Sequence, residues 1–240
     1  FFILKKLIKT DKTIKYDVAI DFSAYNNIFS AYTLNSNANK KVIWIHNDYK
    51  IKYKNEFKFR VLFNLSKSKY KNFDEIVAVS EGVKESFKEL TGLTAKKVIP
   101  NYINTDEILK KSEEKVDFHV DDDNINFCFL GRLVYQKGLD LLFPIIKEYK
   151  KNNEEFQLYI IGDGPLKDKL INQVEELDLF DNITFLGAKN NPFPYLKKCD
   201  YLILNSRYEG QGMVALEAKS LGLKVIMPER LNKYLNIDYI

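Results

Sequence analysis

The sequence is poor in cysteine and has no long apolar run. Its 240 residues include only Cys128 and Cys199, each in or beside an apolar strand-like run and without the spacing of metal ligands. This pattern favours buried, reduced thiols, which suit the cytosol. No segment reaches the ~18 consecutive apolar residues that a membrane-spanning helix needs. Neither a disulfide framework nor a transmembrane helix is therefore expected.

Arginine-rich runs with interleaved aromatic residues are also absent, so nucleic acid is not an expected partner. The formal net charge of +4 comes mostly from dispersed lysines. This charge permits contact with anionic substrates or a membrane surface without requiring it. Lysine-rich helices expected within residues 1–12 and 50–71 could rest on an anionic membrane, although solvated faces are the favoured account. Peripheral membrane contact therefore stays an open expectation.

Strand-like and helix-like segments alternate along the first half of the chain. Apolar residues at helical spacing (Phe57, Val61, Leu62, Leu65) predict a helix from about Asn55 to Lys71. A second helix is expected after Ser80, which would cap it, and before Gly92. Strands are predicted over residues 16–22, 41–46, 75–79 and 97–99. This alternation predicts a mainly parallel sheet covered on both faces.

The second half repeats the alternation more regularly. Strands are predicted over residues 126–130, 157–161, 183–186, 201–204 and 223–227. Glycines follow the first four of them: Gly131, Gly162, Gly187 and Gly210. Ligands of such sheets bind beyond the carboxyl ends of the strands. A charge-dense interval near residues 112–124 separates the halves, which predicts an α/β protein with domains at residues 1–104 and 105–240.

The most informative stretch runs from Asn205 to Gly222. A helix is expected from about Gly212 to Leu221, with Glu217 on its inward face and Glu209 ahead of it. A buried carboxylate needs a partner, and glycines before a helix allow close approach of an anion. The glycine-containing loop, the start of the helix and the inward-facing Glu217 together predict a site for a polyol attached to a phosphate. A tight turn with a structurally paired glutamate is the alternative.

At this point the sequence resembles a known family, the retaining glycosyltransferases of family 4, which have the GT-B fold. The motif E-x7-E runs from Glu209 to Glu217, and G-R-L-x-x-x-K-G runs from Gly131 to Gly138. The turn G-x-G-P is Gly162–Pro165, and a strand-plus-glycine element is Ile183–Gly187. Residues 77–83 and 99–101 are similar to the end of the family's first domain and to its link into the second. The resemblance implies two Rossmann-like domains, the first one incomplete.

The chain also departs from the family pattern at both ends. The opening strand and glycine-rich loop of the first domain are not found ahead of Phe1, and the usual final strands and crossing helix are not found beyond Met227. We therefore expect this chain to be the middle of a longer enzyme.

The resemblance implies a glycosyltransferase that uses a nucleoside diphosphate sugar and retains the anomeric configuration. Negative charge grows on the diphosphate leaving group, and fixed cations and backbone amides lower that barrier. The expected catalytic residues are Arg132, Lys137, Glu209 and His46. The expected substrate-binding residues are Gly131, Gly162, Gly187, Gly210, Gln211, Gly212, Met213, Val214 and Glu217. For His46 the alternative is a satisfied surface histidine. Asp48 would either orient His46 or simply cap the loop.

Neither a metal nor a cofactor is expected. Apart from the aspartates of the charge-dense interval near residues 112–124, the donor half has no Asp-x-Asp that would form a metal-binding element, and its positive side chains would substitute for a divalent cation. The acceptor implied by the family is a glycan or lipid-linked glycan of cell-surface polysaccharide synthesis. The place of action would be the cytoplasm or the inner face of the membrane.

Other functions are compatible with parts of this sequence. A non-catalytic or partial GT-B interaction protein that keeps nucleotide-sugar binding stays open. A nicotinamide-dependent dehydrogenase is disfavoured, because Lys167 stands where its G-x-G-x-x-G fingerprint needs a third glycine. A phosphorylase that uses pyridoxal phosphate is disfavoured too, because no lysine stands in a recognisable setting for that cofactor.

Overall fold

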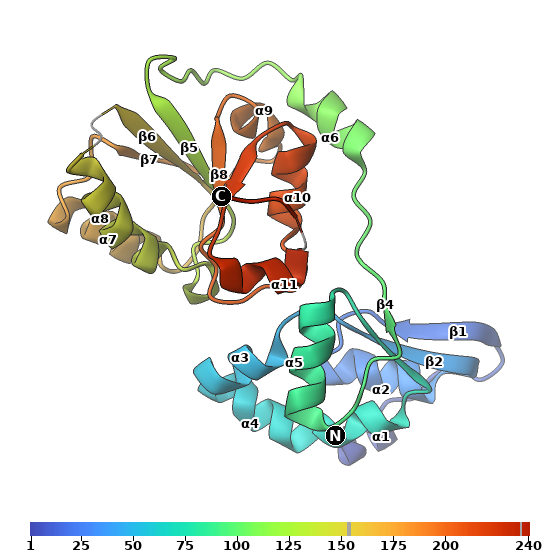
Figure 1. Ribbon diagram of the computed structural model, residues 1–240. Coiled ribbons are helices and arrows are strands. Elements are labelled where there is room, and N and C mark those ends of the chain that lie inside the picture. Colours follow the sequence, from blue (N-terminus) through green and yellow to red (C-terminus); the bar gives the residue numbers. More distant parts are fainter. Residues whose placement is uncertain (153–154, 236) are drawn as a thin grey trace. The chain divides into compact units, whose positions relative to one another are not determined.

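The computed structural model describes residues 1–152, 155–235 and 237–240, which divide into two compact units (Figure 1). The first unit comprises Phe1–Asn101 with Tyr208–Gln211, and the second comprises Tyr102–Arg207 with Gly212–Ile240. Each unit contains a parallel β-sheet with helices packed against it. The predicted α/β class with mainly parallel sheets is therefore confirmed.

The sheet of the first unit has the strand order β1-β2-β3-β4. Its strands are β1 (Tyr16–Asp21), β2 (Ala38–Ile45), β3 (Glu75–Ala78) and β4 (Lys97–Val98). Its helices are α1 (Phe2–Leu7), α2 (Asn27–Asn35), α3 (Tyr49–Asn55), α4 (Phe57–Ser66), the 3-10 helix η1 (Lys67–Asn72) and α5 (Glu81–Thr91). As predicted, Ser80 caps α5 by accepting a hydrogen bond from the Val83 amide, and Gly92 ends it in the left-handed conformation.

Aromatic rings hold the helices of the first unit together. The ring of Tyr49 in α3 lies 6.0 Å from Phe63 in α4, 6.5 Å from Tyr70 in η1 and 6.1 Å from Phe87 in α5, measured between centroids. All four side chains are buried. Such edge-to-face and tilted pairs add to the free energy gained by burying apolar surface. The cluster therefore fixes which face of α4 points inward.

The helix predicted from about Asn55 to Lys71 is interrupted, and its apolar stripe faces solvent. Glu56 adopts an extended conformation (φ −115°, ψ 103°) between α3 and α4. Within α4 only Phe63 and Ser66 are buried. The exposed residues are Phe57, Val61, Leu62 and Leu65. Helical spacing predicted a helix but not its packed face, because Phe63 on the opposite side belongs to the aromatic cluster.

The sheet of the second unit has the strand order β7-β6-β5-β8-β9. Its strands are β5 (Ile125–Leu130), β6 (Phe156–Ile161), β7 (Ile183–Gly187), β8 (Tyr201–Ile203) and β9 (Lys224–Ile226). Its helices are α6 (Thr105–Ser112), η2 (Tyr135–Lys137), α7 (Leu139–Lys150), α8 (Lys167–Glu176), α9 (Phe193–Leu196), α10 (Met213–Ser220), η3 (Glu229–Leu231) and α11 (Asn232–Leu235). Because β5 pairs with both β6 and β8, the strand order reverses there. This is the switch point at which such sheets bind ligands.

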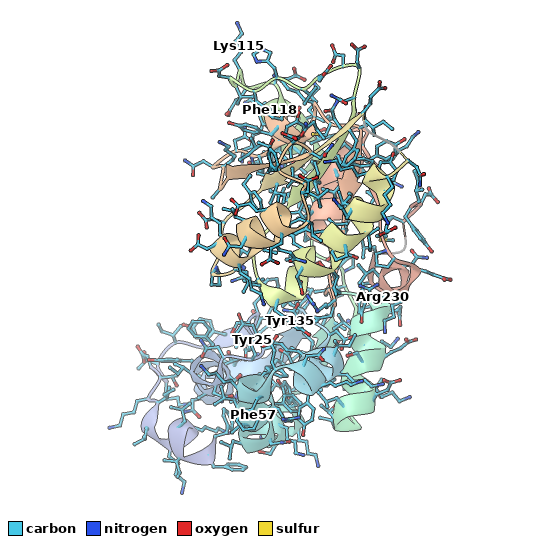
Figure 2. All side chains as sticks on the ribbon, turned by 90° about the vertical axis from the view of Figure 1, so that its left-hand side faces the viewer. Tyr25, Phe57, Lys115, Phe118, Tyr135 and Arg230 are labelled. Atoms are coloured by element: carbon cyan, nitrogen blue, oxygen red, sulfur yellow. The ribbon has the colours of Figure 1, made fainter. Side chains whose placement is uncertain are left out.

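The core of the second unit lies between its sheet and helices α7 and α8. It includes Phe129, Leu133, Phe143, Leu158, Ile160, Leu170 and Val174. The segment that leads into β5 is held by Phe118, whose ring lies 5.0 Å from Tyr159 and 5.2 Å from Tyr195 (Figure 2). The predicted thiols are buried and unbridged: Cys128 donates to the Tyr201 carbonyl, with Sγ 3.3 Å from the oxygen, and Cys199 is buried beside it.

None of the helices within the described residues combines the length and apolar character needed to cross a bilayer.

Candidate functional site

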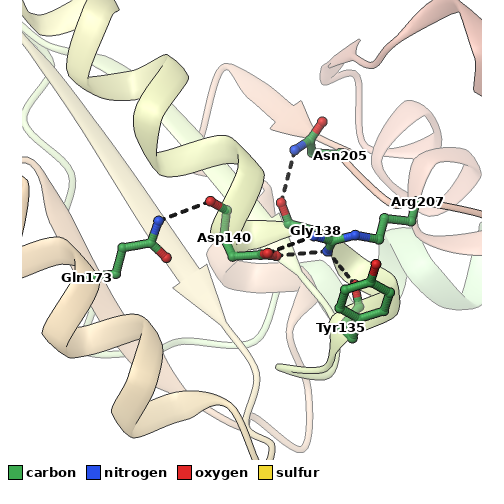
Figure 3. Close-up of polar contacts among 6 residues, drawn as sticks. All are labelled: Tyr135, Gly138, Asp140, Gln173, Asn205 and Arg207. Carbon is green, nitrogen blue, oxygen red and sulfur yellow. Dashed lines mark hydrogen bonds and ion pairs between the residues drawn. The ribbon is translucent and has the colours of Figure 1, made fainter. Parts of the chain in front are cut away.

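The carboxyl ends of β5 and β8 carry the loops that border the switch point. Gly138 begins α7 in the left-handed conformation (φ 70°), and a β-carbon there would stand 2.3 Å from the carbonyl oxygen of Asn205. The side-chain amide of Asn205 donates to the carbonyl of Gly138 at 3.0 Å (Figure 3). The two loops are therefore in direct backbone contact, which only glycine at position 138 permits.

The loops after β5 and β6 approach each other just as closely. A β-carbon on Gly162 would stand 1.9 Å from the carbonyl oxygen of Gly131, and one on Gly164 would stand 2.6 Å from that of Leu133. The amide of Leu133 donates to the carbonyl of Asp163 at 2.9 Å. These glycine-rich turns were predicted from the sequence. They let the loops after β5, β6 and β8 expose backbone groups rather than side chains at the switch point.

Lys137 and Glu217 form the charged part of this site. The aliphatic stem of Lys137 lies against Gly131, since a β-carbon there would stand 3.3 Å from Cε of the lysine. Glu217 is half-buried on α10. Burial raises the pKa of Glu217, and the positive charge of Lys137 partly opposes that shift. The structure therefore brings the predicted phosphate-binding lysine and the predicted ribose-binding acid within electrostatic reach of each other.

A small pocket of about 200 Å³ opens beside Glu217. Its walls include Met213 from α10, Phe193 from α9, and Glu107 and Lys111 from α6. The last two form an ion pair at 2.6 Å between Nζ and Oε1. Helix α6 was not predicted from the sequence, because this region was interpreted as the boundary between the two domains. Asn104, whose side chain caps α6 by accepting from the Glu107 amide, is the signal that identifies it.

Arg207 and Asp140 form an ion pair that was not predicted from the sequence. Arg207 follows β8, Asp140 lies in the first turn of α7, and Nη2 and Oδ2 are 2.6 Å apart (Figure 3). The guanidinium also stacks on the Tyr135 ring, 3.8 Å from its centroid. The hydrogen bonds from Arg207 lower the pKa of Asp140, and the same bonds raise the pKa of Arg207. No local pattern signals this pair.

The remaining predicted residues of the second unit have simpler surroundings. Arg132 is exposed on the loop after β5, and Gly187 ends β7 in open space. Gly212 starts α10, where the helix buries Ala215 and Ala218. Met213 and Val214 in its first turn are half-buried. The inward face predicted for Glu217 is therefore only partly right, because Ala215 and Ala218 make the buried contact and Glu217 stands half-buried at its margin.

Four predicted residues belong to the first unit. His46 follows β2, and a β-carbon on Gly210 would stand 1.8 Å from its carbonyl oxygen. Ser80 donates to the carbonyl of Gly210 at 2.7 Å. Gln211 accepts from the Asn101 amide at 2.5 Å and donates to its carbonyl at 3.1 Å. Glu209, between Tyr208 and Gly210, is buried. The motif is therefore divided, with Glu209 in one unit and Glu217 in the other.

The His46 side chain is held by aromatic rings. Its ring centroid lies 4.3 Å from that of Phe22 and 6.3 Å from that of Trp44. Its Nε2 atom is buried and has no hydrogen-bond partner among the residues that the structure describes. Burial lowers the pKa of His46, which keeps the imidazole neutral at pH 7. Asp48 caps α3 by accepting from the Ile51 amide at 2.8 Å, which is the second of its two predicted roles.

Across the parts of the chain that the structure describes, no group of three or more His, Cys, Asp or Glu side chains is placed to hold a metal ion. Metal-independent catalysis stays a prediction.

Comparison with known families and proteins agrees with the fold and the motifs. Residues 110–230 match the family described as glycosyl transferases group 1. An uncharacterized glycosyltransferase of Methanocaldococcus jannaschii is 30% identical over 235 residues, which cover 92% of this chain and 57% of that protein. A Campylobacter jejuni N-acetylgalactosaminyltransferase, named for a diphospho-undecaprenol acceptor, is 31% identical over 175 residues, which cover 72% of this chain and 46% of that protein. The chain thus spans about half the length of these relatives.

Solved structures show the same architecture. A mutant of S. aureus TarM, solved in complex with fondaparinux, alpha-GlcNAc-glycerol and UDP, superposes with a TM-score of 0.67 at 20% identity. The match covers 94% of this chain and 43% of that one. At this identity the likeness establishes the fold and no more.

Proposed function

Because the chain belongs to the group 1 glycosyltransferases, we propose that it moves a sugar from a nucleoside diphosphate sugar to a glycan or lipid-linked acceptor, with retention at the anomeric carbon. Residues 1–104 would serve the acceptor and residues 105–240 the donor. The protein would act in the cytoplasm at the inner face of the membrane, in the synthesis of a cell-surface polysaccharide. The name of the Campylobacter relative supports the lipid-linked acceptor.

One observation carries this proposal: Lys137 and Glu217 share an electrostatic environment beside the switch point of the second sheet. A diphosphate needs a cation, and ribose hydroxyls need an acceptor. An ammonium and a carboxylate that lie near each other can meet both demands of one nucleotide. The complex of a related fold with UDP supports a uridine nucleotide as the donor.

Each predicted residue then has a chemical role in donor transfer. Cleavage of the anomeric carbon–oxygen bond leaves negative charge on the diphosphate, which Arg132 and Lys137 would stabilise. Glu217 would accept hydrogen bonds from the ribose. Backbone amides of Gln211, Gly212, Met213 and Val214 would hold sugar hydroxyls and phosphate. Glu209 and His46 would lie near the donor sugar, and Gly131, Gly162, Gly187 and Gly210 would let backbone approach it.

The roles of His46 and Arg132 rest on different support. A neutral imidazole can accept or donate one hydrogen bond to a sugar hydroxyl without adding charge, and the lowered pKa of His46 suits that task. Arg132 is exposed, which suits a guanidinium that engages its phosphate only when the donor is bound. Positive side chains would replace a divalent cation in this account.

The first test is ligand binding measured by thermal unfolding. UDP is expected to raise the unfolding temperature, because a ligand at ~100 times its dissociation constant stabilises by ~2.7 kcal/mol. NAD is expected to have no effect. Lys137→Met and Glu217→Gln should each weaken the UDP effect by at least about tenfold in affinity. Lys147→Met, on α7 and with a side chain that is 35% exposed, is the matched control and should bind like wild type. Absence of stabilisation by any nucleoside diphosphate contradicts the proposal.

The second test separates an enzyme from a nucleotide-binding relative that has lost activity. Hydrolysis of, or transfer from, a panel of nucleotide sugars should be detectable in the complete polypeptide. Arg132→Ala and Lys137→Ala should each lower that rate by about a hundredfold or more. A protein that binds UDP but is inactive with the whole panel would be a non-catalytic GT-B interaction protein, which is the alternative.

A further inference from the structure

The break between α3 and α4 has no cause in the local sequence. The two helices meet at Glu56, which is extended (φ −115°, ψ 103°) and so ends one helix and precedes the next (Figure 1). Helix kinks usually arise at proline, at glycine or where another group inserts, and residues 49–66 contain neither proline nor glycine. Glutamate itself favours the helical conformation. The cause of the break therefore lies in the tertiary structure.

The carboxylate of Glu56 has a partner from a distant part of the chain. Although Glu56 stands at the N-cap position of α4, its side chain makes no capping hydrogen bond to that helix. Its Oε1 atom instead accepts a hydrogen bond from the phenol of Tyr208, which lies 152 positions further along the chain. Its Oε2 atom lies 3.9 Å from Nζ of Lys52, one helical turn earlier. The bond to Tyr208 thus takes the place of a helix cap.

Tyr208 belongs to a short segment that packs on the first unit. Residues 208–211 cluster with that unit, although the chain on both sides of them belongs to the second. Tyr208 is 1% exposed, and a buried phenol needs a hydrogen-bond partner, which Glu56 supplies. The carbonyl of Gly210 accepts a hydrogen bond from Ser80 at 2.7 Å. Side chains of the first unit therefore hold the segment at both of these residues.

The same segment carries Glu209, the acid that the proposed function places near the donor sugar. Glu209 is buried and directly follows Tyr208. The next residue, Gly210, packs on the backbone of His46, where a β-carbon would stand 1.8 Å from the carbonyl oxygen. A shift of Tyr208 would pass through one peptide bond to Glu209 and change its position relative to His46. A misplacement of about 1 Å can lower an enzymatic rate by about a hundredfold.

We propose that Glu56 is a positioning residue, which fixes Glu209 relative to His46 by binding the phenol of Tyr208. The inference deepens the proposed function and rests on it for the role of Glu209. Glu56 touches no substrate in this account. The extended conformation at the break between α3 and α4 directs its carboxylate to the phenol instead of to the first amides of α4.

The first experiment measures how firmly the segment is held, without any substrate. The amide of Asn101 donates to Oε1 of Gln211 at 2.5 Å, so its hydrogen exchange, followed by NMR, reports whether residues 208–211 stay in place. Glu56→Ala and Tyr208→Phe should each speed this exchange by about tenfold, because local opening becomes easier. Glu56→Gln keeps an acceptor oxygen and should return the rate to within about threefold of wild type.

Two controls separate release of the segment from a general loss of stability. The amide of Val79 donates to the carbonyl of Ile45, between the ends of β3 and β2, and should exchange at the wild-type rate in every variant. Glu89→Ala on α5 removes another carboxylate of the first unit, one that lies 2.5 Å from Nζ of Lys50. It should change neither exchange rate. An equal rise at Val79 and Asn101 in Glu56→Ala would show that the whole unit is destabilised, which overturns the inference.

The second experiment separates turnover from nucleotide binding. UDP lacks the sugar, and its proposed contacts are Lys137 and Glu217, so Glu56→Ala should bind UDP within about twofold of wild type. The kcat for transfer from a nucleotide sugar by the complete polypeptide should fall by about tenfold or more. Glu56→Gln should recover most of that rate. Combining Glu56→Ala with Tyr208→Phe should cost no more than either change alone, because both remove the same hydrogen bond.

Several results would overturn the inference. These are unchanged exchange at Asn101 in Glu56→Ala, a parallel loss of UDP affinity, a Glu56→Gln variant as impaired as Glu56→Ala, and additive losses in the double variant. A wild-type protein that binds UDP and transfers no sugar would refute the proposed function instead. The exchange rate at Asn101 would still decide whether Glu56 holds the segment that carries Glu209.

Discussion

The guanidinium of Arg207 donates two hydrogen bonds to the carboxylate of Asp140, at 2.8 and 2.6 Å. A third bond runs from Arg207 to the carbonyl of Tyr135 at 2.6 Å. The pair connects the segment after β8 to the start of α7, and Tyr135 opens the turn that carries Lys137. Because a planar guanidinium fixes both partners in orientation, it also sets the position of the lysine proposed to bind the diphosphate.

Loss of this pair should destabilise the second unit. Asp140→Asn leaves the guanidinium of Arg207, whose side chain is 14% exposed, without its charged partner. We expect the free energy of unfolding to fall by about 1–2 kcal/mol, measured by urea denaturation. Glu148→Gln is the matched control on α7, because its pair with Lys151 is exposed on both sides and should contribute less than about 0.5 kcal/mol. Equal losses in the two variants would contradict this role.

The same pair predicts a pH dependence with a definite sign. The pKa of Asp140 is lowered in the folded state, chiefly by the hydrogen bonds from Arg207. Its stabilising contribution is therefore complete above the unfolded value of about 3.9 and disappears as the pH falls through the folded one. The stability difference between wild type and Asp140→Asn should be constant from about pH 5 to 7 and should shrink below about pH 4. A difference that grows in acid would exclude this explanation.

Glu217 should oppose folding while it supports binding. Burial raises its pKa, so the folded state favours the protonated acid, and its ionised form at neutral pH reduces stability. Glu217→Gln is therefore expected to unfold at the same or a higher temperature than wild type at pH 7. UDP affinity should nevertheless fall at least about tenfold, because an ionised acceptor is lost. Calorimetric titration and thermal unfolding together check both signs. A variant that is less stable and binds UDP normally would place Glu217 in a structural role.

Two glycines of the second unit should differ in why they resist substitution. Gly164→Ala puts a β-carbon 2.6 Å from the carbonyl oxygen and 2.8 Å from the amide of Leu133, so backbone must move. We expect a loss of about 2–3 kcal/mol. A β-carbon on Gly187 would meet nothing within 4 Å, so Gly187→Ala is disfavoured only by the left-handed backbone conformation (φ 72°). We expect it to lower the free energy of unfolding by about 1 kcal/mol. Urea denaturation of both variants tests the difference, and the reverse order would show that the loops do not touch.

Adjacent residues of α4 should behave oppositely on truncation. Phe63 is 4% exposed in the aromatic cluster, so Phe63→Ala should destabilise the first unit by about 3–5 kcal/mol. Leu62→Ala removes an exposed side chain and should change stability by less than about 0.5 kcal/mol. Comparable losses at the two positions would mean that the apolar stripe on α4 is buried.

Periodicity in the sequence predicted the strands well and the helix faces poorly. β3 and β6 begin within one residue of their predicted positions. A short run of consecutive apolar residues is typical of a strand that is buried on both faces of a parallel sheet. The helix α2 was missed, although Asn26 caps it by accepting from the Ile28 amide. On α7, the apolar residues Leu141 and Ile145 are exposed, whereas Leu139 and Phe143 are buried. A helix with apolar residues on more than one side does not reveal which side packs.

The order of residues along the chain determined the family motifs, the alternation of strands and helices and the glycines at strand ends, because backbone geometry and spacing are local properties. Tertiary structure alone decided that Arg207 meets Asp140 across 67 positions, that Lys137 shifts the pKa of Glu217, and that the apolar stripe of α4 faces water. These relationships depend on which distant segments are neighbours in space. The spacing of residues within one segment does not predict these relationships, because they depend on how separate helices and strands pack against one another.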